Sequence, residues 1–315
     1  MTSPTKSDSL VLRAMGPDSS NMDVDIERIR SHIVRLTQSP RPAQSDELEQ
    51  ARRYVTDGLE KAGWLVQRAP FSAVADDGIT RLQGVNLVAR HALHAAGGPR
   101  LCVGAHLDSR PDTVGADDNA SAVAALLEIA RLLPAKWPAS AKLDLELVAF
   151  DLEENGMLGG AFHAGRLKAE GVDLRAMVSL EMLGYCDRAP GSQALPRSLV
   201  GKYPDTGNFI AVIGNQNSGD LIGAMCAGMQ TVAGLPVETL AVESNGEYLQ
   251  ATRLSDHSPF WDAGYAAVMI TDTSFLRNPY YHTPGDTMET LDMPFLHRVA
   301  EGCFQAVRHI VANGL

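Results

Sequence analysis

Apolar positions along the chain follow two alternating patterns. From residue 23 onward they recur every three or four residues, which is typical of an amphipathic helix facing a core. Between such stretches lie short uninterrupted apolar runs, which are typical of buried strands. The first predicted helix begins near residue 23 and is closed by 39–42; further helices are predicted over 45–62, 120–133, 160–170, 220–233 and 294–312, and strands over 64–67, 85–89, 101–105, 143–150, 176–180, 209–213, 239–242 and 266–270.

Strands that alternate with helices predict a mainly parallel or mixed sheet with helices on both faces. We therefore expect an α/β fold with three layers, α/β/α, around one central twisted mixed sheet, and a single domain over 23–315. Residues 1–22, rich in Ser, Thr, Asp and Pro, are expected to be disordered. The segment 186–208 is punctuated by Pro and Gly and is too long for a simple connection, so we expect it at the rim of an active site.

Composition excludes several classes of function. The net charge of -11, with no Lys/Arg-rich cluster, argues against nucleic acid as a partner. No secretory signal and no apolar run of about 18 residues is present, so we expect a soluble chain with no membrane partner. It is expected in the cytoplasm as it stands, or secreted if a signal was removed.

The 4 cysteines form no C-x-x-C pair, which makes a thiolate zinc site improbable and leaves a disulfide possible. Oligomeric state has no signal in the sequence.

Ionisable residues come directly after three of the predicted strands. His106 follows 101–105, Glu153 and Glu154 follow 143–150, and Glu181 follows 176–180. Ligands of open α/β sheets bind just beyond the carboxyl ends of the strands, so these side chains are expected at one rim. Each also has a structural interpretation: a lone His is more often a surface residue, and paired acids on a turn are often only solvated.

Two further segments carry candidate ligands. Asp117 and Asp118 precede a helix, where acids commonly cap free N–H groups, although one of them could instead bridge two cations. His282 lies in a stiff loop between two prolines, next to Tyr281. Asp108 projects to the same side of its extended segment as His106 and could orient the imidazole ring.

The run Ser255-Asp256-His257 suggests a serine hydrolase triad, which we reject. Three adjacent residues cannot align a nucleophile, a base and an orienting acid, and the chain has no G-x-S-x-G elbow. We expect this run to cap a short helix that begins near Ser258, close to the site.

Taken together, six motifs resemble metallopeptidase family 28 in their form and order. They are GAHLDS (104–109), GADDNAS (115–121), EENGMLGG (153–160), LEMLGY (180–185), SDHSPFWDAG (255–264) and NPYYHTPGDT (278–287). That family includes aminopeptidase Y, bacterial leucyl aminopeptidases, glutamate carboxypeptidase II and, more remotely, glutaminyl cyclase. Each motif alone is a weak signal, and the six in this order are a strong one.

The resemblance implies two zinc ions and a role for each matching residue. His106, Asp118 and Glu181 would bind one zinc, and Asp118, Glu154 and His282 the other. Asp118 would be the bridge and Asp117 only its neighbour. Glu153 would be the general base, Asp108 the partner of His106, and Tyr281 a hydrogen-bond donor to the substrate carbonyl. Two departures from the family pattern are Glu181, where many members carry Asp, and Asp-Asn-Ala-Ser-Ala, where Ser-Gly is usual.

Imidazole and carboxylate ligands without thiolate suit zinc, and also cobalt or manganese. Two such ions could lower the pKa of a shared water towards about 7 to generate hydroxide. We therefore expect a metallo-aminopeptidase that hydrolyses peptide bonds and releases N-terminal amino acids, with Glu153 as the base. The alternatives are an N-acyl amino acid deacylase or a glutaminyl cyclase on the same fold, acting on a small amide substrate, and a non-catalytic binding protein.

Overall fold

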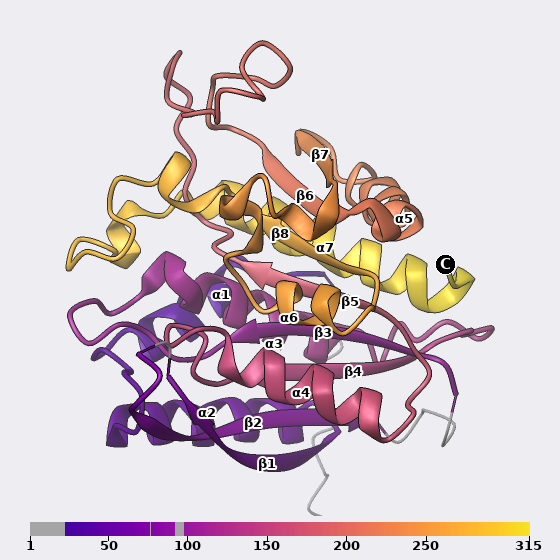
Figure 1. Ribbon diagram of the computed structural model, residues 1–315. Helices are drawn as coiled ribbons and strands as arrows, with labels where there is room; N and C mark the ends of the chain where they lie inside the picture. The colour runs from indigo at the N-terminus through magenta and orange to yellow at the C-terminus, as the bar shows by residue number, and fades with distance from the viewer. Residues whose placement is uncertain (1–22, 76, 92–97) are drawn as a thin grey trace, which may run out of the picture.

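One mixed sheet of 8 strands forms the centre of the molecule in the computed structural model, which describes residues 23–75, 77–91 and 98–315 (Figure 1). The strand order is β1-β2-β4-β3-β5-β8-β6-β7. The strands are β1 (Trp64–Val74), β2 (Arg81–His91), β3 (Arg100–His106), β4 (Asp144–Phe150), β5 (Leu174–Glu181), β6 (Ile210–Asn215), β7 (Val237–Val242) and β8 (Ala267–Thr271). The disorder expected for 1–22 concerns residues outside the described ranges.

Four neighbouring strands in the middle of the sheet, β4, β3, β5 and β8, run parallel. Their carboxyl ends therefore meet at one edge, on the left in Figure 1. The outer strands differ, because β2 pairs antiparallel with β1 and β4, and β6 pairs antiparallel with β8. The expected mixed sheet is confirmed.

Helices cover both faces of this sheet. They are α1 (Ile26–Leu36), α2 (Asp46–Lys61), α3 (Ala122–Leu132), α4 (Leu158–Ala169), α5 (Gly219–Met229), α6 (His257–Asp262) and α7 (Met293–Asn313). On one face α1, α2, α3, α5 and α7 share a large apolar core with the strands, and on the other face α4 and α6 build a smaller core. The three-layer α/β/α architecture is thus confirmed. Single turns of helix lie at Ala116–Ser121, Gln216–Ser218, Ser244–Gly246, Gln250–Arg253, Ser274–Leu276 and Met288–Thr290.

Local chemistry explains where several helices begin. The side chains of Asp25, Ser45 and Asp292 accept hydrogen bonds from backbone N–H groups in the first turns of α1, α2 and α7, which satisfies donors that have no partner inside the helix. Between the sheet and α1, α3 is apolar almost all round, as expected for a helix buried on both sides.

Several boundaries differ from those the sequence predicts, most of all in the first two strands. β1 and β2 have 11 residues each, more than twice the predicted lengths, because they extend as a hairpin whose outer half alternates buried and exposed residues and so lacks a continuous apolar run. Also, α3 begins two residues later than predicted, because Asp118 and Asn119 leave the helical conformation.

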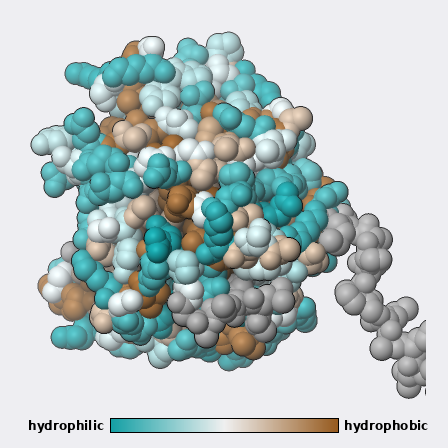
Figure 2. Space-filling view, turned by 90° about the vertical axis from the view of Figure 1, so that its right-hand side faces the viewer, coloured by the Kyte–Doolittle hydropathy of each residue, from teal (hydrophilic) through white to brown (hydrophobic). Residues whose placement is uncertain are grey.

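The surface and the cysteines carry no unusual feature among the described residues. Figure 2 shows the face opposite the carboxyl-end edge, where hydrophilic residues separate the hydrophobic ones. All four cysteines are free thiols. Within the described ranges, no helix has both the length and the apolar character needed to cross a bilayer.

We predict that Leu147→Ala, in the centre of β4, destabilises the protein by about 2–5 kcal/mol, because it leaves a cavity in a core that cannot fully collapse. Leu147 is 0% exposed and belongs to the large core. The matched control is Leu65→Ala in β1, where the side chain is 70% exposed and the expected change is below about 1 kcal/mol. Urea denaturation measures both. Equal losses for the two variants would contradict this assignment of the core.

Candidate metal centre

The carboxyl-end edge of the sheet collects the candidate ligands from five segments. His106 is the last residue of β3 and Glu181 the last of β5. Glu154 lies in the turn after β4, Asp118 in the irregular turn before α3, and His282 in the loop that follows β8. The fold thus brings together, at the carboxyl ends of the strands, residues that are far apart in the chain.

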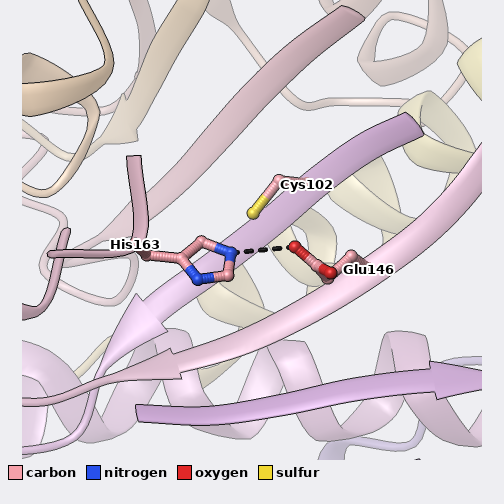
Figure 3. Close-up of side chains that lie close together, drawn as sticks. All are labelled: Cys102, Glu146 and His163. Carbon is pink, nitrogen blue, oxygen red and sulfur yellow. Dashed lines mark hydrogen bonds and ion pairs between the residues drawn. The ribbon is translucent and has the colours of Figure 1, made fainter. Parts of the chain in front are cut away.

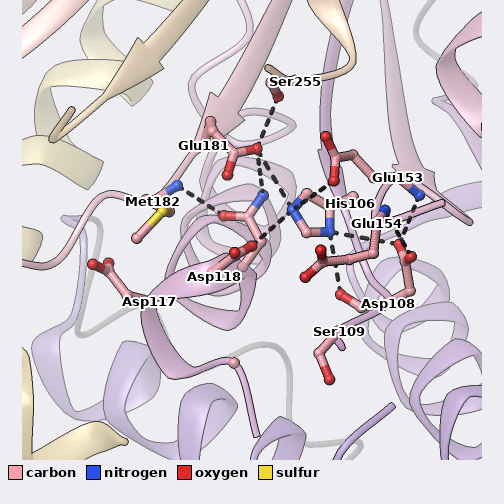
Figure 4. Close-up of polar contacts among 12 residues, drawn as sticks. His106, Asp108, Ser109, Asp117, Asp118, Glu153, Glu154, Glu181, Met182 and Ser255 are labelled. Atoms are coloured by element: carbon pink, nitrogen blue, oxygen red, sulfur yellow. Dashed lines mark hydrogen bonds and ion pairs between the residues drawn. The ribbon is translucent and has the colours of Figure 1, made fainter. Parts of the chain in front are cut away.

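Three of these side chains converge on one point, as Figure 4 shows. His106 Nε2 lies 3.1 Å from Asp118 Oδ1 and 3.5 Å from Glu181 Oε2. All three residues are buried, and their ligand atoms lie within 4.8 Å of one another. Two ligands about 2.0–2.1 Å from a tetrahedral zinc ion are about 3.3 Å apart, so this spacing fits one zinc ion.

A second group of three lies directly beside the first and shares Asp118 with it. His282 Nε2 is 3.2 Å from Asp118 Oδ2 and 3.2 Å from Glu154 Oε2. Asp118 therefore turns a different carboxylate oxygen toward each group, which is the geometry of a bridging ligand. Asp117 points away in Figure 4 and accepts hydrogen bonds from Gly184 N and Asn278 Nδ2 instead.

Unpartnered polar atoms support a metal at this place. His106 Nε2 and Glu154 Oε1 are buried and make no hydrogen bond among the described residues. Buried polar groups are normally hydrogen-bonded, because leaving one unpaired costs about 1–3 kcal/mol. Both atoms belong to the residue groups just described, so a cation between the ligands would give each a partner. The residues present therefore fit zinc.

Crowded carboxylates raise one another's pKa values in this centre. Burial and then neighbouring carboxylates raise the pKa of Glu153 well above its usual value, although His106 opposes the shift. Burial and Asp118 raise the pKa of Glu154 to about 7, and burial also raises that of Glu181. Without added cations the centre thus retains protons at neutral pH.

The pKa values of the two histidines and of Asp118 shift in the direction opposite to the one that burial alone would give. Burial lowers the pKa of His106, but Glu181 and Glu153 raise it well above the usual value. Burial likewise lowers the pKa of His282, but hydrogen bonds to Asp118 and Glu154 raise it to about 9. Burial would raise the pKa of Asp118, yet the two imidazoles hold it below its usual range.

Asp108 links two ligand-bearing segments. Its carboxylate accepts hydrogen bonds from the backbone N–H groups of Glu153 and Glu154, each at 3.1 Å. It also lies 3.5 Å from His106 Nδ1, while the hydrogen bond of that nitrogen goes to the main-chain carbonyl of Asp108 at 3.2 Å. With Nδ1 as donor, Nε2 keeps its lone pair free for a metal.

Two further residues hold the segments that carry candidate ligands, and neither role was predicted from the sequence. Asp286, within the motif 278–287, accepts hydrogen bonds from the backbone N–H groups of Asp117 and Asp118. Asn119 donates to Leu180 O at 3.0 Å and accepts from Met182 N at 2.9 Å, so it fastens the bridging turn to the end of β5.

Arg41 is buried beneath the same loops. Its guanidinium donates to the carbonyl oxygens of Leu36, Leu107, Val114 and Gly115. It thereby holds the segment that contains Asp108 against the segment that leads to Asp118. Arg41 stands between two prolines in the sequence, and nothing in that pattern indicates such a role.

The backbone is strained where the ligands are attached. Leu152, Met182 and His282 adopt left-handed conformations with φ of 58°, 48° and 56°. Such conformations cost roughly 1–3 kcal/mol each for residues with a side chain and persist where the surroundings impose them. Gly115 also has a positive φ of 58°, and a Cβ there would lie 2.0 Å from the carbonyl oxygen of Asp118. That position therefore requires glycine.

A cleft lies over the centre, and we call it the metal cleft. Its lining includes Arg110, Asp118, Glu153, Glu154, Glu181, Tyr281 and His282. Glu153 Oε2 is 3.9 Å from His106 Nε2, so this carboxylate stands beside the first group of ligands. The Tyr281 ring stacks on that of His282 with centroids 3.7 Å apart, and its hydroxyl makes no hydrogen bond within the described part of the chain.

The expected cap at Ser255–His257 was wrong. α6 begins at His257, and the side chain of Asp256 makes no capping hydrogen bond, because its backbone is already helical with φ -58° and ψ -15°. The run does lie close to the centre, since Ser255 Oγ donates to Glu181 Oε2 at 2.8 Å. Ser255 thus holds one of the candidate ligands.

Beside the metal cleft lies an apolar pocket. Its walls come from 193–213, which includes much of the Pro/Gly-rich excursion, and from 249–254 and 269–276. We call it the apolar pocket; its lining includes Leu195, Leu199, Tyr203, Phe209, Met269 and Phe275. Glu181, Leu254 and Ser274 line both the pocket and the metal cleft, so the two are contiguous.

A second group with metal-ligand chemistry, Cys102, Glu146 and His163, lies on the α4 face of the sheet (Figure 3). Glu146 is already neutralised there, by His163 Nε2 at 2.8 Å and by Arg100 Nη1 at 2.8 Å. Burial raises the pKa of the Cys102 thiol well above its usual value, which keeps it protonated. A guanidinium beside the group would repel a cation, so we interpret it as a buried ion-pair network. His163 lies on α4 and is fully buried.

Comparison with known proteins assigns this chain to one peptidase family. The model of peptidase family M28 matches residues 86–307. The uncharacterized protein YfbL of Escherichia coli is 35% identical over 85% of this chain and 88% of its own length. A probable leucine aminopeptidase of Arthroderma otae is 27% identical over 76% of this chain, and the chain spans 63% of that protein.

Solved structures with the same fold include an aminopeptidase and a glutaminyl cyclase. The Legionella pneumophila LapA aminopeptidase superposes with a TM-score of 0.69 at 17% identity, over 92% of this chain and 73% of LapA. Porphyromonas gingivalis glutaminyl cyclase superposes with a TM-score of 0.69 at 20% identity, over 90% of this chain and 98% of that one. At these identities the likeness establishes the fold alone.

We predict that zinc binding to the metal-free protein releases protons and strengthens as pH rises from 6 to 8. His282, with a pKa raised to about 9, and Glu154, with a pKa raised to about 7, must lose their protons before they can ligate zinc. Calorimetric titration at pH 7 in buffers of different ionisation enthalpy counts the protons released. An affinity independent of pH, with no proton release, would contradict this account of the charges.

Proposed function

Because the chain belongs to peptidase family M28 and is a zinc-dependent hydrolase, we propose that it is an aminopeptidase with two zinc ions that releases N-terminal amino acids from peptides. The observation that carries the proposal is the pair of ligand groups that share Asp118. His106, Asp118 and Glu181 would hold one ion, and Asp118, Glu154 and His282 the other. Four carboxylates, counting Glu153, would then balance two divalent cations.

The apolar pocket supports a preference for bulky apolar N-terminal residues. Polar residues are among those that line it, but the surface that the pocket presents is almost wholly apolar, and burying a Leu or Phe side chain contributes about 1.5–3 kcal/mol. Because Glu181 lines both cavities, a residue whose side chain fills the pocket has its backbone beside the metal cleft. A peptide that begins with leucine suits this arrangement.

Glu153 is the residue we assign as general base. Zinc, when bound, supplies Lewis acidity that lowers the pKa of water and polarises a carbonyl group. The Glu153 carboxylate lines the cleft and is not needed as a ligand in either group, so it can take a proton from the attacking water. It can then deliver that proton to the leaving amine, which returns the carboxylate to its starting form.

Tyr281 and Asp108 have supporting roles in the proposal. The Tyr281 hydroxyl has no protein partner in the described part of the chain and lines the cleft, so it can donate a hydrogen bond to the carbonyl oxygen as negative charge develops there. Asp108 acts by position, because it binds the backbone of Glu153 and Glu154 and lies beside the His106 ring.

We predict that metal analysis of protein purified without chelator finds about two zinc ions per chain, as expected for two ligand groups with one bridge. His282→Ala removes a ligand from only one group and should lower the content to about one. His309→Ala, at an exposed position on α7, is the matched control and should leave the content unchanged. One ion per chain in the unaltered protein would favour a single-zinc cyclase over the aminopeptidase.

We predict that Glu153→Gln lowers kcat for leucyl peptides by about 10²- to 10⁴-fold while zinc content stays the same, because the amide keeps the shape of the side chain but cannot accept the proton. Glu60→Gln, on the exposed face of α2, is the control and should leave kcat unchanged. Full activity of Glu153→Gln would rule out this residue as the base. Hydrolysis of N-acetylated peptides by the unaltered protein, in preference to free ones, would favour a deacylase.

A further inference from the structure

Arg110 is the one arginine or lysine among the described residues that line the metal cleft. Its guanidinium makes no hydrogen bond within the described part of the chain, and its nearest ionic neighbour is Glu154, with Nη1 3.9 Å from Oε2. The side chain is 44% exposed. A half-exposed cation with free donors therefore faces a cleft that is otherwise acidic.

Arg110 lines the metal cleft but not the apolar pocket. It lies next to Glu154 of the second ligand group, which contacts His282. The apolar pocket instead has Glu181 of the first ligand group in its wall, and its Phe275 contacts Tyr281. Arg110 and the pocket thus occupy different places around the centre.

This arrangement offers a place for each half of a substrate. If the N-terminal side chain fills the apolar pocket and the scissile carbonyl lies between the ligand groups, a leaving residue on the side of Glu154 lies next to Arg110. One extended residue spans about 3.3–3.6 Å, so the carboxylate of a single leaving residue would lie about one residue from the carbonyl. Arg110 Nη1 lies at a comparable distance, 3.9 Å, from Oε2 of Glu154.

We propose that Arg110 binds the carboxylate of the leaving residue and makes this enzyme favour dipeptides over longer or amidated peptides. The proposal rests on the aminopeptidase function proposed above. Guanidinium is suited to this task because its planar fork matches a carboxylate with two parallel hydrogen bonds. Once Glu154 binds zinc, its charge is engaged, and the donors of Arg110 are available to a substrate.

A simpler interpretation is that Arg110 only offsets the negative charge of the cleft. In that case the preference for a carboxylate would depend on the charge alone, so Arg110→Lys would keep all of it, whereas direct binding through the planar fork would lose part of it. Both interpretations are tested by a ratio of rates, which is insensitive to the fraction of the protein that is folded.

The experiment compares kcat/KM for Leu-Gly and Leu-Gly-amide, which differ only in that carboxylate, using the zinc-loaded full chain. We expect Leu-Gly to be favoured about tenfold, the effect of one charge-assisted pair at a half-exposed position. Arg110→Gln should lower the ratio to about one, and Arg110→Lys should keep part of it, since lysine retains the charge without the fork. Leu-Asp-amide tests a side-chain carboxylate as the source of recognition.

The matched control is Arg175→Gln, an exposed arginine at the start of β5 that pairs with Asp173, and it should leave the ratio at about ten. A preference for Leu-Asp-amide over Leu-Gly that Arg110→Gln abolishes would assign the recognition to a side-chain carboxylate and would overturn the preference for dipeptides. Hydrolysis of both peptides with a ratio of one, or an equal ratio with and without Arg110, overturns the inference and leaves the aminopeptidase intact. If neither peptide is cleaved, the proposed function and this inference both fall.

Discussion

Crowding of four largely buried carboxylates is the constraint on which the rest of this site depends. Asp118, Glu153, Glu154 and Glu181 repel one another, and the repulsion is stronger away from bulk water. In the metal-free chain, burial and the neighbouring carboxylates raise the pKa values of the three glutamates, so that bound protons join the two imidazoles in supplying the compensating charge. Two divalent cations would supply the same charge without protons. Metal affinity and acid–base chemistry therefore have one physical origin.

Such repulsion has to be opposed by rigid supports, and they share a pattern. Polar groups that bind no metal accept hydrogen bonds from the backbone of segments that carry ligands. Asp108 does so for the turn after β4, Asp286 for the turn that holds Asp118, and Asn119 for the residue after Glu181. Each candidate ligand carboxylate is thus held through the main chain of its segment, and Glu181 is held through the hydroxyl of Ser255 as well.

Local sequence patterns predicted most of the fold and the ligand candidates, because each depends on nearby residues. The alternating strands and helices, and the acids that follow strands, can be recognised within a few positions. Residues that act across the fold could not be recognised in this way. Arg41 contacts loops 66 to 74 positions away, and Ser255 reaches Glu181 over 74. A motif selected Asp118 over Asp117 as the candidate bridging ligand. The backbone of Asp118 departs from the helical conformation, and helix propensities do not indicate such a departure.

Glu181 shows how a departure from the family pattern is accommodated. A glutamate has one more methylene group than aspartate, so its carboxylate reaches further and has one more torsion to restrain. Ser255 supplies a restraint, since its hydroxyl donates to Glu181 Oε2 and is itself 3.0 Å from that of Ser179 on the same strand as Glu181. Glu181 also forms part of the apolar pocket wall. The longer side chain thus joins the metal centre to the place where the substrate side chain would bind, and its position affects both.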